Sequence, residues 1–116
     1  KNIDGLIIPK IPHNIDHAAY KCYLRINLNS LKSSWSRDRI MSKINDYGVP
    51  CFSGSCSEIY KEKAFDNSLF RPKTFLKNAR TLGEESLMFV VHPTLKKENI
   101  DKTITVLKKT YLEAKR

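Results

Sequence analysis

A continuous apolar run from Leu87 to Val91 is the feature that most constrains how this 116-residue chain folds. A run of this length favours a buried strand over a helix. His92 and Pro93 end the run, and residues 99–112 then repeat apolar side chains at helical spacing, with lysines on the opposite side. The chain is therefore predicted to end with a buried strand followed by a long amphipathic helix.

Two further helices are predicted upstream. Ser36 is placed to cap a helix that Gly48 terminates, because serine caps helix starts and glycine readily adopts the left-handed conformation that ends them. Pro72 suits the first turn of a second helix, and Gly83 is placed to end it.

Two further strands complete the pattern. Residues 20–28 alternate apolar and polar side chains, as in a strand with one buried face, and residues 49–52 form a short apolar segment. The resulting order is strand, helix, short strand, helix, strand, helix. This order predicts an α/β (α+β) two-layer sandwich, in which a small sheet is covered on one face by about three helices.

The composition narrows the class of protein. A net charge of +9 permits an acidic partner such as a nucleotide diphosphate, but the basic residues are scattered, which favours a solvated surface over a nucleic-acid stripe. No apolar stretch approaches the ~20 residues of a membrane span, and no leader pattern opens the chain. Three cysteines without a CxxC motif fit a reducing compartment. We therefore expect a cytoplasmic protein.

Two histidines and two cysteines could in principle bind a metal or act as nucleophiles, but their surroundings in the sequence favour structural roles. His13 and His17 lie four residues apart, but Asn14 follows the first histidine where a zinc protease has glutamate, so no metal site is predicted. Cys51 and Cys56 have no neighbouring histidine to activate a thiolate, which favours small packed side chains.

A small-residue loop is the best candidate for ligand binding. Residues 53–55 (Ser-Gly-Ser) offer hydroxyl and backbone donors that suit a phosphate or a sugar, although the Gly-Lys-Ser/Thr ending of a P-loop is absent. Arg37 opens the first helix, where a structural role beside Asp38 is favoured over a substrate contact. The aromatic residues, Tyr60 among them, favour a core or an interface. No complete catalytic set is present.

Several motifs in order resemble a known family, the DegT/DnrJ/StrS aminotransferases, and specifically their C-terminal small domain. The resemblance covers residues 11–112 and rests on His17-Ala-Ala-Tyr-Lys-Cys-Tyr23, Arg37-Asp38, Tyr47-Gly-Val-Pro50, Ala79-Arg-Thr-Leu-Gly83 and His92-Pro-Thr-Leu95. Members of this family are pyridoxal-phosphate (PLP) enzymes of the aspartate-aminotransferase fold. Most of them move an amino group, usually from glutamate, to a nucleotide-linked keto sugar.

The resemblance implies a domain organisation and a set of partners. Residues 1–13 would be a linker from an N-terminal PLP-binding domain, and residues 14–116 a small domain with a mostly antiparallel sheet. The parent enzyme would be a homodimer that acts in surface-polysaccharide (LPS) synthesis, with neither a nucleic acid nor a membrane as partner. The fragment itself would be inactive and hold no PLP.

The resemblance also implies site residues. Phe52, Ser53, Gly54 and Ser55 would border the substrate, with Arg37 and Tyr60 as neighbours. Relatives often carry imidazoles in this loop, and this chain does not, so the identity of the sugar stays open. Ser68 and Lys73 repeat the family's spacing around its cofactor-binding lysine, but the glycine-rich continuation is missing. No catalytic, cofactor-binding or metal residue is therefore assigned to this chain.

Two alternatives come from other classes of function. The charge and the α/β pattern also suit a free-standing basic module that binds nucleic acid, for which salt-dependent binding would be diagnostic. A structural dimerisation domain is the other alternative, and a monomer at high concentration would count against it.

Overall fold

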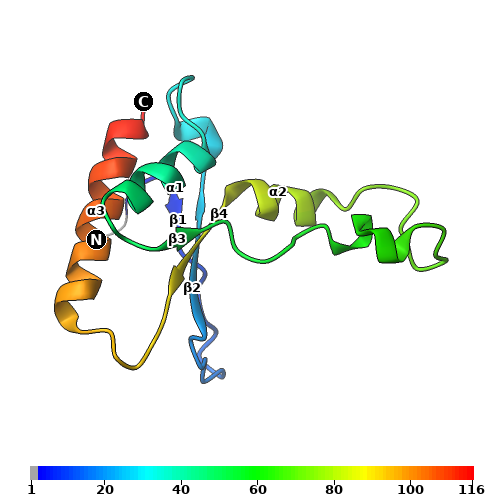
Figure 1. Cartoon of the computed structure of the whole chain (residues 1–116), viewed down its shortest axis with the longest axis horizontal. Helices are drawn as coiled ribbons and strands as arrows, with labels where there is room; N and C mark the ends of the chain where they lie inside the picture. The colour runs from blue at the N-terminus through cyan, green and yellow to red at the C-terminus, as the bar shows by residue number, and fades with distance from the viewer. Residues whose placement is uncertain (1–2) are drawn as a thin grey trace.

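The computed structural model describes residues 3–116, which form an antiparallel sheet and three α-helices. The sheet has four strands in the order β1-β2-β4-β3. Figure 1 shows α1 and α3 on one side of this sheet, whereas α2 extends away from it. This arrangement confirms the predicted α+β class. The strands are β1 (Leu6–Ile7), β2 (Lys21–Ile26), β3 (Cys51–Phe52) and β4 (Ser86–Val90).

The apolar run identified in the sequence is the central strand β4. It pairs with β2 on one side and β3 on the other, and Leu87, Met88 and Phe89 are all buried. Side chains of a strand alternate between the two faces of the sheet, so burial of three in succession means that both faces are covered here. The prediction of a buried strand is confirmed.

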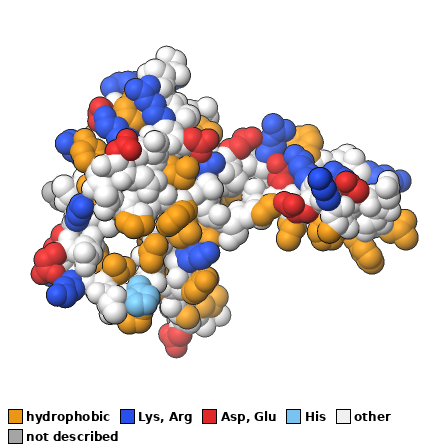
Figure 2. All heavy atoms as spheres, viewed as in Figure 1, with side chains coloured by type: hydrophobic (Ala, Val, Ile, Leu, Met, Phe, Trp, Pro, Cys, Tyr) orange, Lys and Arg blue, Asp and Glu red, His pale blue; other side chains and the backbone are white. Residues whose placement is uncertain are grey.

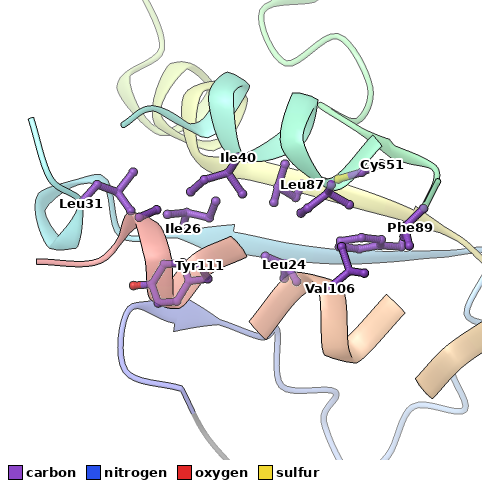
Figure 3. Close-up of a cluster of buried hydrophobic side chains, with 12 residues drawn as sticks. Leu24, Ile26, Leu31, Ile40, Cys51, Leu87, Phe89, Val106 and Tyr111 are labelled. Atoms are coloured by element: carbon purple, nitrogen blue, oxygen red, sulfur yellow. The ribbon is translucent and has the colours of Figure 1, made fainter. Parts of the chain in front are cut away.

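One hydrophobic core lies between the sheet and two helices, α1 (Arg37–Asp46) and α3 (Lys97–Ala114). Figure 3 shows side chains of β2 and β4 meeting those of both helices. Fully burying one such side chain stabilises the fold by roughly 1.5–3 kcal/mol. The main members of the core are Leu24, Ile26, Ile40, Ile44, Leu87, Phe89, Val106 and Tyr111.

Helix α1 forms as the sequence predicts. The Ser36 hydroxyl accepts a hydrogen bond from the Arg39 backbone N–H at 3.1 Å, and Gly48 follows the helix with a φ of +68°. Just before the helix ends, the Asn45 side chain accepts from the Cys51 N–H at 3.0 Å and donates to the Cys51 carbonyl at 2.9 Å. This amide satisfies the backbone of β3 and ties it to α1.

Helix α2 (Lys77–Glu85) differs from its prediction at both ends. It begins five residues after Pro72, and it continues through Gly83. A Cβ at Gly83 would lie 2.1 Å from the Ser57 Oγ, so this glycine permits a close approach of two segments and does not end the helix. The two segments belong to residues 57–85, here called the arm, which also contains 3-10 turns at Ile59–Lys61 and Lys63–Phe65.

The segment predicted to be a linker packs on the domain. Within residues 1–13, Leu6 and Ile7 form β1 and pair with β2. The Tyr111 hydroxyl donates to the Asp4 carbonyl at 3.1 Å, and a Cβ at Gly5 would lie 1.8 Å from that hydroxyl. Ordered packing therefore starts well before residue 14. A further 3-10 turn, Leu28–Ser30, follows β2. In residues 3–116, none of the helices has the length and apolar character needed to cross a membrane.

Candidate functional site

The predicted ligand loop begins where β3 ends. Cys51 is buried in the core, and the next side chain, Phe52, turns to the other face of the sheet with 47% of its surface exposed. Gly54 then adopts a φ of +94°, a left-handed conformation that glycine takes without strain. The loop thus presents a half-exposed aromatic ring followed by two exposed serines.

Tyr23 of β2 supports this loop from below. A Cβ at Gly54 would lie 2.9 Å from the Tyr23 ring, so only glycine lets the loop settle on it. The Tyr23 hydroxyl lies 3.3 Å from the Ser55 Oγ, within hydrogen-bonding distance. The sequence places Tyr23 on the wetter face of β2, but nothing local to it indicates that a loop 31 residues later folds back over its ring.

Arg37 occupies a structural position. Its Nη1 donates to the Ser86 carbonyl at 2.8 Å, and its Nε pairs with Asp38 at 2.6 Å. The guanidinium therefore joins the start of α1 to the start of β4. Among residues 3–116, no hydrogen bond links it to residues 53–55.

Tyr60 organises the arm. Only 9% of its surface is exposed, its hydroxyl donates to Glu58 Oε1 at 2.6 Å, and the same hydroxyl accepts from the Leu76 backbone N–H at 3.0 Å. The bond from Tyr60, assisted by Lys61, holds the pKa of Glu58 below its ordinary value. Tyr60 thus connects the segment around Glu58 to the segment that precedes α2. Its hydroxyl already has one donor and one acceptor partner within the arm.

Burial makes Cys51 a poor nucleophile. Removal from water raises the pKa of its thiol to about 11, an effect that the backbone N–H of Phe52 and the charge of Arg37 only partly offset. The thiolate, the reactive form, is therefore scarce near neutral pH. This result agrees with the small packed side chain expected for Cys51, whereas the same expectation is wrong for Cys56, which is exposed.

Neither Lys73 nor the hollows along α1 form part of the loop at residues 52–55. Lys73 is exposed in the arm between Pro72 and α2, outside any helix or strand. Two shallow hollows lie along α1, one lined in part by Arg39 and Asp46 and the other by Trp35 and Arg37. Neither is lined by residues 52–55. Within residues 3–116, no three histidine, cysteine or acidic side chains converge as a metal site would require.

The sheet, its helices and the protruding arm define an α+β domain of the kind found in aminotransferases. The X-ray structure of the aminotransferase from Psychrobacter cryohalolentis is 46% identical and matches with a TM-score of 0.87, over 94% of this chain and 29% of that one. The comparison with protein-family models finds no match, and neither does the comparison with curated proteins.

More distant structures share the fold. One is a DegT DnrJ EryC1 StrS aminotransferase from Brucella abortus, with 19% identity and a TM-score of 0.72, over 91% of this chain and 26% of that one. Another is NtdA from Bacillus subtilis with bound cofactor PMP, with 17% identity and a TM-score of 0.70, over 92% of this chain and 23% of that one. These structures confirm the resemblance to DegT/DnrJ/StrS aminotransferases at the level of the fold, and the 46% identical structure, of which this chain spans 29%, is itself an aminotransferase.

Proposed function

We propose that this chain is the C-terminal small domain of a PLP-dependent aminotransferase that moves an amino group, usually from glutamate, to a nucleotide-linked keto sugar. The observation that carries the proposal is the 46% identity to the Psychrobacter aminotransferase across 94% of this chain. The chain spans only 29% of that protein, so the PLP-binding lysine is assigned to the remainder of the parent enzyme.

The surface of the arm supports a place inside a larger protein. Within the arm, Leu69 is 100% exposed and Phe70 is 86% exposed. Figure 2 shows hydrophobic side chains gathered along one side of this projection. Large apolar side chains grouped on a surface are typical of an interface. Others in the arm are Ile59, Phe75, Leu76 and Leu82.

The remaining parts of the proposal follow from the same family. The parent enzyme is a cytoplasmic homodimer that serves surface-polysaccharide synthesis, and its sugar substrate is bordered by residues 52–55. PLP supplies the electron sink for amino transfer when it is bound in the large domain. The contribution of this chain is to shape and close the substrate side of the site, since Phe52, Ser53 and Ser55 are the exposed side chains of its loop.

Reductive labelling tests where the cofactor is held. PLP and borohydride are added to the full-length enzyme and, separately, to residues 1–116, and labelled lysines are located by mass spectrometry. The proposal expects one specifically labelled lysine in the enzyme, outside these residues, and only scattered labelling of the isolated chain. Specific labelling of Lys73, lost in Lys73→Ala, would place the cofactor in this chain and overturn the proposal.

A further inference from the structure

The strand register sets three side chains in one row across the sheet. Phe52 of β3 pairs with Met88 of β4, and Met88 pairs with Tyr23 of β2. The next residues along two of these strands, Phe89 and Leu24, belong to the core beneath α1 and α3. Since successive side chains of a strand point to opposite faces, the row of three lies on the face away from those helices.

Polar groups are held over this row. The left-handed turn at Gly54 settles on the Tyr23 ring, and Ser55 is carried to within 3.3 Å of the Tyr23 hydroxyl. Ser55 is exposed and Tyr23 partly so. This face therefore carries the half-exposed ring of Phe52 and, across Met88, the two accessible hydroxyls of Tyr23 and Ser55.

The charge on this face is uneven. Arg25, two residues after Tyr23, is paired with Glu85 at 2.5 Å, which neutralises that end of β2. Lys21, two residues before Tyr23, lies opposite Val90 and has no ion-pair partner among residues 3–116. Two residues along a strand span roughly 6–7 Å, so the Lys21 ammonium is within reach of a ligand on the row.

We propose that Lys21, Tyr23, Phe52 and Ser55 together bind the nucleoside-diphosphate part of the sugar substrate. A diphosphate is strongly anionic and suits an ammonium that lacks a counter-ion. The two hydroxyls suit phosphate or sugar oxygens, and the exposed ring of Phe52 provides a stacking surface for a base or a sugar face. The inference rests on the proposed function and adds Lys21 and Tyr23 to the residues that the sequence suggests.

Steady-state kinetics of the full-length enzyme test this assignment. Lys21→Met is expected to raise KM for the nucleotide sugar about tenfold, as loss of one charge-assisted contact does, while kcat changes little. Tyr23→Phe keeps the ring under Gly54, removes one hydroxyl and is expected to raise the same KM about threefold. The half-reaction with the amino donor involves no diphosphate and should keep its rate in both variants.

A matched control and a simple probe separate this surface from general charge effects. Lys108→Met removes the same charge from an exposed position on α3 and should leave KM unchanged. Inorganic pyrophosphate should inhibit competitively against the nucleotide sugar, and Lys21→Met should weaken that inhibition whereas Lys108→Met should not. Equal KM and equal pyrophosphate inhibition in Lys21→Met and wild type would overturn the inference and leave the proposed function intact. A wild-type enzyme that transfers no amino group would instead overturn the proposed function.

Discussion

Replacing Gly5 with alanine tests whether the N-terminal segment belongs to the folded domain. The φ of +91° at Gly5 costs an alanine about 1–2 kcal/mol, and its Cβ would lie 1.8 Å from the Tyr111 Oη and 2.7 Å from the Ser30 Oγ. Overpacking of this kind adds about 1–3 kcal/mol. The substituted chain can also release residues 3–7, which limits the total, so we expect a loss of about 2–3 kcal/mol in the free energy of unfolding.

Partial rescue distinguishes the steric contact from backbone strain. Tyr111→Phe removes the hydroxyl that the new Cβ would meet, and the next ring atom lies at 3.0 Å. In that background the backbone strain and the Ser30 contact remain, so Gly5→Ala should cost about 1–2 kcal/mol, which gives a coupling free energy of about 1 kcal/mol. Gly48→Ala is the control, because its φ of +68° is also left-handed but its Cβ meets only the flexible end of Lys102 at 3.4 Å.

Urea denaturation of the 116-residue chain measures these free energies. Hydrogen exchange at the Asn27 amide, which donates to the Gly5 carbonyl at 2.8 Å, reports release of the segment directly. A cost below about 0.5 kcal/mol, with unchanged exchange at Asn27, would refute the packing of residues 3–7 and restore the simple linker.

Three further predictions concern the helices and the core. Gly83→Ala should loosen the arm and speed proteolysis between residues 57 and 85, although alanine has the higher helix propensity, because the new Cβ would meet Ser57. Adding Ser57→Gly should restore resistance to proteolysis. If Gly83→Ala alone is more resistant than the wild type, the contact between Gly83 and Ser57 is contradicted. Asn45→Ala should lower the free energy of unfolding in urea by about 2 kcal/mol, because it leaves the Cys51 N–H and carbonyl without their hydrogen-bond partner. A change below about 0.5 kcal/mol would show that these two hydrogen bonds do not stabilise the fold. At pH 8 a thiol reagent should modify the exposed Cys22 and Cys56 but spare Cys51, whose pKa burial raises from 9.0 to about 11. Stability from the neutral Cys51 thiol is full below pH 9.0 and is lost as the pH rises through about 11, so rapid modification of three thiols at pH 8 would contradict this burial.

Local patterns were sufficient for the parts of the fold that local physics controls. The apolar run of β4 has few alternatives to a buried strand, and Ser36 and Gly48 act on the ends of α1 through bonds and dihedral angles within a few residues. Family motifs placed the substrate loop after β3. That loop is exposed in the structure, and its contact with substrate stays a prediction.

Contacts between distant segments account for what the sequence did not reveal. The position of α2 depends on Gly83 meeting Ser57, and the docking of β1 depends on Tyr111, which is 107 residues from its partner Asp4. Helix α3 shows the same limit. The apolar spacing of residues 99–112 includes Ile100 and Ile104 as expected core positions, but both are exposed. The buried residues of the helix are all in its second half: Val106, Thr110, Tyr111 and Ala114. Only tertiary packing decides which part of an amphipathic helix meets the sheet.

Amino transfer by the full-length enzyme tests the central claim most directly. The enzyme, loaded with PLP, is incubated with ¹⁵N-labelled glutamate and nucleotide-linked 3-keto and 4-keto sugars, and the products are identified by mass spectrometry. The account predicts a nucleotide-linked amino sugar that carries ¹⁵N, together with an equal amount of 2-oxoglutarate. An enzyme that binds PLP but transfers no label to any nucleotide-linked keto sugar would contradict it.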